Sequence, residues 1–283
     1  MNDHYLLYID VLGFADLVEK QPERVEDLFQ IVASLNVHDH PSFSAVVFSD
    51  TILVHNILPP SSDHDREYFV MFQCEFFQDL LQRLAGRDIS LRAVLTYGPF
   101  EHYLLNGIHY FYGTALNRAY HADKSLPLTG LVMDSHCLSF SKVFSTRPFG
   151  DWHYVFVTQA LDEWEDTYGG MTPLPWIVIH DTDLGWQLGP WIEVIACSAR
   201  HAKEHHDPSV RSKHSMTLEL YRNRYPQCFR TLEPANFQME AVNRAFPWPK
   251  VRELMHQRYA LGVERQMPSA GEHSNLRRSP SER

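Results

Sequence analysis

The order of apolar segments between residues 5 and 134 restricts the fold more than any other feature of this chain. Short runs rich in β-branched and aromatic residues alternate with longer stretches whose apolar residues recur at helical spacing. The predicted strands cover residues 5–11, 43–49, 51–57, 89–98 and 129–134, and the predicted helices cover 14–36, 66–85 and 113–124. This order is typical of a ferredoxin-like βαββαβ sheet with helices on one face. We therefore predict an α+β fold.

The remaining segments predict one more hairpin and a helical extension. Asn106-Gly107 favours a tight turn within FEHYLLNGIHYF. After residue 150, YVFVTQ and WIVIH are predicted strands, and residues 188–206, 209–228 and 249–263 are predicted helices. We expect residues 1–150 to form the core unit, and residues 151–265 to pack on it or on a dimer interface. The polar tail, residues 266–283, is predicted to be disordered.

The composition is that of an ordinary globular protein. Hydrophobic residues make up 44% of the 283 residues, and the net charge is 25 − 35 = −10. An acidic chain argues against a general nucleic-acid partner, although a nucleotide can still bind beside a metal ion. The four cysteines form no CxxC pair, and no stretch is apolar enough for a membrane span. The N-terminus MNDHYLLYID has no basic segment before its short apolar run, which argues against a secretory signal. We expect a cytoplasmic protein with reduced thiols.

Two aspartates are candidates for a metal site. Asp10 ends the apolar run YLLYID, and Asp50 occupies the turn between the second and third predicted strands. In a βαββ unit these two strand ends can lie side by side. Two neighbouring carboxylates repel each other unless a proton or a cation lies between them. Mg²⁺ binds one or two carboxylates and leaves its other positions for water and phosphate oxygens. The pair is therefore interpreted as a divalent-metal site for a nucleotide, against the alternative of a structural turn pair.

Four motifs, in this order, resemble the signatures of the class III nucleotidyl cyclases. They are YIDVLGF, FSDTILV, LRAVLTYGPF and GTALNRAY. The two aspartates are 50 − 10 = 40 residues apart, close to the interval usual in that family. The tyrosine of LTYG, the helix start FYGTAL and the segment KHSMTLELYRNRY resemble one branch of it, the pyrimidine nucleotide cyclases (uridylate and cytidylate cyclases) of the Pycsar anti-phage systems. The resemblance implies a class III cyclase catalytic core, residues 1–150, with a C-terminal helical extension.

The resemblance also implies a set of ligand-binding residues. Asp10, Asp50 and the backbone carbonyl of Val11 would hold two divalent ions, Mn²⁺ or Mg²⁺. Gly13 and Phe14 would open the helix that receives the triphosphate, since amides at a helix N-terminus suit anions. The enzyme would be a homodimer whose active sites lie at the interface.

The fourth motif departs from the family pattern. Asn117, supplied by the second chain, would orient the ribose near the transition state. The arginine that usually follows four residues later is replaced by His121. The role of stabilising charge on the reacting phosphate would fall to His121, to the neighbouring Arg118 or to Arg92, or catalysis would be weak.

The base-reading positions also differ from those of the purine cyclases. Val46 and Tyr110 stand where the family has the lysine and aspartate that read adenine, which argues against ATP. The hydroxyl of Tyr97, like that of Tyr110, can serve uracil or cytosine. Arg92 favours the carbonyl of uracil, so UTP is the expected substrate. The reaction would be attack of the ribose 3′-oxygen on the α-phosphate, giving 3′,5′-cyclic UMP and pyrophosphate.

Several alternatives stay open at this stage. CTP could replace UTP, with cyclic CMP as product. The chain could be another cyclase-fold enzyme, purine-specific or a dinucleotide synthase, although FSDT lacks the acidic signature of the GGDEF-type synthases. A catalytically inactive cyclase-fold domain could instead bind a nucleotide or a phage component as a sensor. In the cyclase interpretation, a separate effector protein would read the cyclic nucleotide.

A second histidine-rich motif lies outside these signatures. His201 and His205, in HAKEHH, are four residues apart, a spacing that two metal ligands on a helix can have. Because no HExxH motif accompanies them, we interpret this segment as a solvated helix face.

Overall fold

A computed structural model describes residues 1–257 of the 283. The strands are β1 (Asn2–Leu12), β2 (Phe43–Phe48), β3 (Thr51–Asn56), β4 (Ser90–Leu105), β5 (Ile108–Tyr112), β6 (Gly130–Met133), β7 (Ser145–Phe149) and β8 (Trp152–Phe156). They form one sheet in the order β2-β3-β1-β4-β6-β8-β7, and β5 pairs only with β4. The β4–β6 pair is parallel, and the other pairs are antiparallel. The first four strands in the sheet, β2-β3-β1-β4, have the ferredoxin-like order that the sequence predicts.

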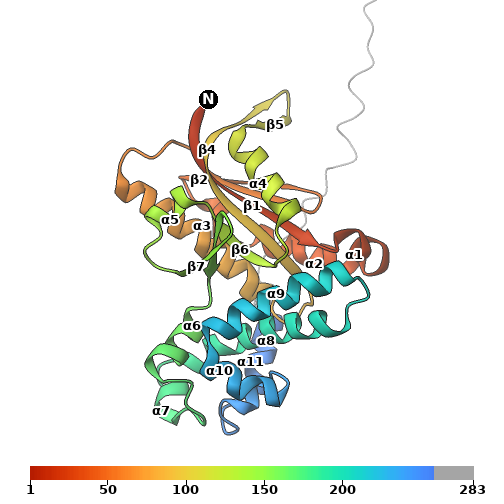
Figure 1. The fold of residues 1–283 in the computed structure, drawn as a ribbon. Helices are drawn as coiled ribbons and strands as arrows, with labels where there is room; N and C mark the ends of the chain where they lie inside the picture. Colours follow the sequence, from red (N-terminus) through yellow and green to blue (C-terminus); the bar gives the residue numbers. More distant parts are fainter. Residues whose placement is uncertain (258–283) are drawn as a thin grey trace, which may run out of the picture.

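Helices cover both faces of the sheet, and not one face as expected. The N-terminal helices are α1 (Phe14–Lys20), α2 (Pro22–Ala33), α3 (Asp63–Leu84), α4 (Thr114–Ser125) and α5 (Ser135–Phe140). On one face, α3 packs on β1, where Gln73 donates a hydrogen bond to the carbonyl of Tyr5. On the other face, α4 packs on β4, where Thr96 donates a hydrogen bond to the carbonyl of Ala115. Figure 1 shows the sheet between these helices.

Local sequence explains how several of these helices begin. Ser62 and Asp65 form a capping box at the start of α3. Pro22 begins α2 and breaks the single helix predicted for residues 14–36, because proline lacks the backbone donor that a helix interior needs. Gly113 precedes α4 with φ +152, and a Cβ at this position would lie 2.2 Å from the Pro99 carbonyl oxygen. This glycine therefore allows α4 to start directly against β4.

The C-terminal region adds a helical layer at the end of the sheet remote from the β4–β5 hairpin (Figure 1). Its helices are α6 (Gln159–Asp162), α7 (Trp176–Ile179), α8 (Leu184–Glu204), α9 (Pro208–Arg224), α10 (Pro226–Leu232) and α11 (Trp248–Gln257). Short helical turns cover Asn36–Asp39, Glu163–Thr167, Glu233–Ala235 and Met239–Ala241. Buried hydrogen bonds from Thr129 to the Thr217 hydroxyl fasten α9 to the segment before β6.

The C-terminal region departs from the sequence prediction at WIVIH. The strand predicted for WIVIH is wrong: Trp176–Ile179 is helix α7, and its backbone bonds are local, as from Ile179 N–H to the Pro175 carbonyl. The expected boundary at residue 150 falls in the turn between β7 and β8, and β8 continues the sheet to Phe156. The tail at 266–283 and the end of the helix predicted for 249–263 lie outside the described residues.

The core consists of apolar side chains between the sheet and both helical layers. The residues of β1 that face α3, such as Leu7 and Ile9, are fully buried, as are Phe77 of α3 and Trp191 of α8. Within the described residues, none of the helices has the length and apolarity to cross a bilayer.

Candidate active site

The two predicted aspartates lie close together where β1 ends beside the β2–β3 turn. Asp10 lies opposite Thr51 in the β1–β3 register, and the Val11 N–H donates a 2.9 Å hydrogen bond to the Asp50 carbonyl oxygen. Asp10 is on the face of the sheet that α4 covers, and both carboxylates line a cleft of about 400 Å³. The register of the hairpin therefore brings together two residues that are 40 positions apart in the sequence, as 50 − 10 = 40.

The cleft is an open groove between α4 and this part of the sheet. Its floor comes from β1 and β3, and one wall comes from α4. The lining residues are Tyr8, Asp10, Phe48, Asp50, Thr51, Leu53, Phe111, Leu116, Asn117, Tyr120 and Lys124. Aromatic and aliphatic side chains thus surround a small set of charged and amide groups. A pocket with a few convergent polar groups among apolar ones is the usual form of a small-molecule site.

Asp10 is a buried carboxylate with few partners. The residue is 6% exposed, and its Oδ2 lies 3.7 Å from Nη2 of Arg92. Burial, and then the negative charge of Asp123, raise the pKa of Asp10 to about 6, against the opposing effect of Arg92. Among the residues that the structure describes, no group donates a hydrogen bond to this carboxylate. Asp10 is therefore available to a cation.

Arg92 is committed to the protein interior, which revises its expected role. Its Nε donates a 2.5 Å hydrogen bond to Asp123 Oδ1, and its Nη1 donates to the Leu126 carbonyl at 3.1 Å. The residue is 3% exposed. Arg92 therefore holds β4 against the end of α4 and stabilises the charge of Asp10 and Asp123. It is not free to read a base or to reach a phosphate.

The α4 residues expected to act in catalysis separate into two groups. Asn117 lines the cleft of its own chain, together with both aspartates. His121 lies one helical turn beyond Asn117, is exposed and does not line the cleft. Its ring contacts the ring of Tyr120. Arg118 points elsewhere: its Nη2 donates a 2.9 Å hydrogen bond to Asp134, and its Nη1 bonds the Tyr97 carbonyl. Arg118 is thus not placed to stabilise a reacting phosphate in this cleft.

The expected base-reading residues are also divided between faces. Val46 alternates with Phe48 along β2, so it lies on the cleft face, opposite Leu53. Tyr97 lies on the opposite face, with its ring stacked on His136 at 4.0 Å and its hydroxyl accepting a hydrogen bond from Arg66. Within one chain, Val46 shares the face of the sheet that carries the cleft without lining it, and Tyr97 lies on the other face.

Tyr110 and the α1 positions are also outside the cleft. Tyr110 is 40% exposed and stacks on Tyr103, while its neighbour Phe111 turns into the cleft. Gly13 precedes α1 with φ +71, a left-handed conformation that favours glycine. It lines a neighbouring cleft beside α8 and α9, and Phe14 packs near Phe29.

Of the residues that line the cleft, the sequence predicted only Asp10, Asp50 and Asn117; the aromatic and charged residues that it missed include Phe111, Tyr120 and Lys124. Lys124 provides a positive charge in the cleft, with Nζ 3.4 Å from Asp123 Oδ2 and 5.4 Å from the centre of the Tyr120 ring. Tyr120 and Lys124 follow Asn117 by three and seven positions on α4. This helical spacing is the signal that could have placed them on the same face as Asn117. Phe111 follows from strand alternation only once the hairpin is placed.

The donor set of the cleft fits a hard divalent cation. Asp10 and Asp50 offer carboxylate oxygens, the ligands that Mg²⁺ and Mn²⁺ prefer. The side chain of Val11 is buried on the α3 side, so only its carbonyl oxygen could take part. The partner-poor carboxylate of Asp10 is the observation that most favours such an ion.

Comparison with solved structures found similar folds at low identity. The adenylyl cyclase CyaB from P. aeruginosa has 12% identity and a TM-score of 0.41, over 54% of this chain and 93% of that chain. The guanylyl cyclase domain of the RhoGC fusion protein from the aquatic fungus Blastocladiella emersonii has 15% identity and a TM-score of 0.44, over 55% and 96%. The guanylyl cyclase Cya2 has 17% identity and a TM-score of 0.39, over 54% and 91%. No family model and no curated protein matched the chain.

Proposed function

We propose that the protein is a class III-type nucleotide cyclase, which converts UTP to 3′,5′-cyclic UMP and pyrophosphate. The observation that carries this proposal is the convergence of Asp10, Asp50 and Asn117 on one cleft. Two carboxylates that can hold metal ions, with an amide across from them, suit a substrate that carries both a triphosphate and a ribose. Each of these residues lies in one of the sequence motifs that resemble the family, YIDVLGF, FSDTILV and GTALNRAY.

Each side chain has a defined task in this proposal. Asp10 and Asp50 would hold divalent ions, which when bound would lower the pKa of the ribose 3′-hydroxyl and neutralise the triphosphate. Asn117 orients the ribose, and Lys124 adds positive charge near the phosphates. The 3′-oxygen attacks the α-phosphorus, the bond to the bridging oxygen breaks, and pyrophosphate leaves. His121, one turn beyond Asn117 at the rim of the cleft, stays a candidate for stabilising negative charge on the reacting phosphate.

The choice of a pyrimidine rests on the base-reading positions. Val46 has no hydrogen-bonding group, and it lies beside Leu53 on the cleft face, so the pair of side chains that reads adenine has no equivalent here. UTP is kept as the proposed substrate and CTP as the competing one, although Arg92, the residue that favoured uracil, is bound to Asp123 and does not distinguish the two. A role in anti-phage defence, with a separate effector reading the product, is part of the same proposal and rests on the sequence resemblance to the Pycsar cyclases.

A homodimer is the proposed active form. The β4–β5 hairpin projects from the sheet (Figure 1) and exposes an apolar surface that a second copy could bury. Its residues are 40–60% exposed: Tyr103, Leu104, Leu105, Ile108, Tyr110 and Tyr112. In such a dimer, Tyr110 would lie at the interface, where it is available to the cleft of the other chain.

The decisive experiment offers ATP, GTP, CTP and UTP separately to the purified protein with Mn²⁺, and identifies products by chromatography with mass detection. We expect cyclic UMP. Cyclic CMP would keep the enzyme class and replace the substrate. Nucleotide binding without any product, from a folded protein, would overturn the proposal in favour of a sensor. Asp50→Asn should abolish the product, while Asp63→Asn, at a side chain 83% exposed on α3, is the matched control.

A complementation test separates the two placements of Asn117. Asp50→Ala and Asn117→Ala chains, each inactive alone, are unfolded and refolded together. If each site combines Asp50 of one chain with Asn117 of the other, mixed dimers hold one intact site and the mixture recovers about a quarter of wild-type turnover. If each site is built within one chain, as the cleft geometry favours, the mixture stays inactive.

A further inference from the structure

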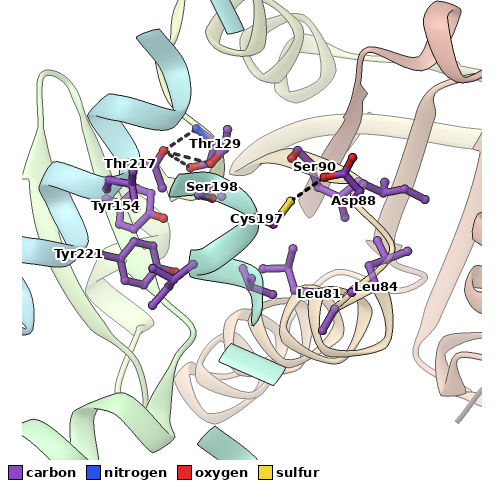
Figure 2. Close-up of a pocket in the computed structure, with 18 residues that line it drawn as sticks. Leu81, Leu84, Asp88, Ser90, Thr129, Tyr154, Cys197, Ser198, Thr217 and Tyr221 are labelled. Atoms are coloured by element: carbon purple, nitrogen blue, oxygen red, sulfur yellow. Dashed lines mark hydrogen bonds between the residues drawn. The ribbon is translucent and has the colours of Figure 1, made fainter. Parts of the chain in front are cut away.

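A second group of potential metal ligands lies where the C-terminal helices meet the sheet. Asp88 occupies the turn between α3 and β4, while Cys197 and His201 are one helical turn apart on α8. A carboxylate oxygen, the sulfur and an imidazole nitrogen of these residues all lie within 4.8 Å of one another. Figure 2 shows the Cys197 sulfur directed at Asp88 across the junction.

We propose that Asp88, Cys197 and His201 bind a zinc ion, with a water molecule as the fourth ligand, and that this ion clamps α8 to the α3–β4 turn. The site is separate from the Asp10 cleft and does not depend on the nucleotide chemistry proposed above.

The distances suit a tetrahedral ion. Asp88 Oδ1 lies 3.3 Å from Cys197 Sγ and 2.9 Å from His201 Nε2. Zinc bonds of the usual length, to oxygen, nitrogen and sulfur, place neighbouring ligand atoms roughly 3.3–3.7 Å apart. Adjustments of a few tenths of an ångström would therefore complete this part of the coordination shell.

Two buried imidazoles at this junction lack hydrogen bonds. His201 Nε2 is buried and makes none, although Asp88 Oδ1 lies 2.9 Å away. His214 of α9 is 1% exposed, its ring stacks on His201 at 4.9 Å, and neither of its ring nitrogens is bonded. Buried polar groups are normally satisfied. An ion on His201 Nε2 would satisfy that nitrogen, and His214 leaves an unpaired nitrogen beside the site.

The ligand types select zinc among common metals. A thiolate and an imidazole are soft or borderline donors, which Mg²⁺ and Ca²⁺ do not take. The carboxylate of Asp88 and the thiolate of Cys197 together balance the charge of a divalent ion, and the thiol proton is released on binding. Two positive charges oppose the ion: Arg24, whose Nη2 lies 3.9 Å from Asp88 Oδ2, and Arg200, whose Nη2 lies 2.7 Å from Asp88 Oδ1. The side chain of Arg200 is 47% exposed, so it turns toward solvent when the ion binds.

The spacing on α8 also corrects the interpretation of HAKEHH as a solvated helix face. The His201 side chain is only 18% exposed because it lies against Asp88. His205 has a different role, since its Nδ1 accepts a hydrogen bond from the Asp207 N–H at the start of α9.

The test uses the full chain, stripped of metal with a chelator and titrated with Co²⁺ and then Zn²⁺. We expect one Co²⁺ per chain with a thiolate-to-cobalt charge-transfer band, which Zn²⁺ abolishes by displacement. Cys197→Ser should remove the band. His201→Gln should weaken binding by more than the roughly 10–100-fold lost when an outer partner of a metal ligand is removed. Asp88→Asn is the second variant, should Cys197→Ser fail to fold.

Two controls match these variants. Cys228→Ser removes another buried thiol, on α10, and His205→Gln removes a histidine one turn further along α8. Both should keep the cobalt band. A wild-type chain that binds no Co²⁺, or a band that survives Cys197→Ser, would overturn the proposal. Because none of these readouts measures nucleotide turnover, an inactive but cobalt-binding protein would contradict only the cyclase proposal.

Discussion

Two aspartates in this molecule have opposite electrostatic surroundings. Asp10 lies in the cleft, and Asp88 lies at the junction with the C-terminal helices. Among the described residues, Asp10 has one ion-pair partner, Arg92 at 3.7 Å, which is shared with Asp123. Burial, and then Asp123, raise its pKa to about 6. Burial also acts to raise the pKa of Asp88, but the neighbouring His201 imidazole and Arg200 guanidinium outweigh it and hold the pKa well below its usual range.

This difference shows where the fold leaves charge unsatisfied. At the junction, Asp88 is surrounded by donors that join α8 to the sheet unit, so its charge contributes to the structure. In the cleft, the negative charge of Asp10 costs stability and is kept available for a ligand. Sites that bind ligands commonly retain such locally unfavourable groups. The following predictions test this comparison, in order of expected effect.

The largest effect is on turnover at Asp10. Asp10→Asn keeps the size of the side chain but removes its charge, so we expect cyclic-nucleotide formation to fall by about 1,000-fold, equivalent to about 4 kcal/mol of transition-state stabilisation. Product formation is measured by chromatography with mass detection, and circular dichroism checks the fold. Turnover near the wild-type level would remove Asp10 from the metal site.

The next effect concerns the amide in the cleft. Asn117→Ala should lower kcat by about 100-fold while nucleotide affinity changes much less, because the contact is proposed to strengthen in the transition state. Steady-state kinetics and nucleotide binding by calorimetry provide the two numbers. Asn223→Ala, an exposed position on α9, serves as the control. Equal losses in kcat and affinity would make Asn117 a ground-state contact.

The third prediction concerns stability: the Asp10→Asn substitution that lowers turnover is expected to raise the free energy of unfolding. The pKa of Asp10 is about 6 when folded and about 3.8 when unfolded, so the folded chain binds more protons between these values. Stability should therefore fall as pH rises from about 4 to 6. Asp10→Asn should raise the free energy of unfolding by about 2 kcal/mol at pH 7.5 and by little at pH 4.

Urea unfolding in a chelating buffer, at both pH values, provides the measurement. A destabilised Asp10→Asn variant at pH 7.5 would mean that Arg92 stabilises the Asp10 carboxylate more than burial destabilises it.

The smallest effect is expected at the junction, with the opposite sign. Asp88→Asn removes the charge that pairs with Arg200 and His201, and should lower the free energy of unfolding by about 1 kcal/mol at pH 7.5, a value reduced for the exposure of this side chain. Asn tolerates the left-handed conformation of this position, φ +57, so the variant isolates the charge. Urea unfolding in the same chelating buffer measures it. A gain in stability would show that both aspartates are held at a cost, and the comparison would fail.

Much of the core followed from local pattern. Periodicity located β1, the β2–β3 hairpin, α3, β4, α4 and β6, and Asn106-Gly107 identified the β4–β5 turn. The meeting of Asp10 and Asp50 also followed, because the ferredoxin-like order sets β3 beside β1 and hairpin geometry sets their register. The break at Pro22 was visible in the sequence but was missed.

The amino-acid sequence by itself determined the elements, the strand order of the first half and the position of both cleft aspartates, because these depend on short-range periodicity and turn chemistry. Only the tertiary structure decided which face each side chain meets. It tied Arg92 to Asp123 and Arg118 to Asp134, and turned Tyr97 away from the cleft. It also brought Asp88 to Cys197, 109 residues away in sequence. Contacts at such separations depend on how helices pack against the sheet, which no local pattern in the chain specifies.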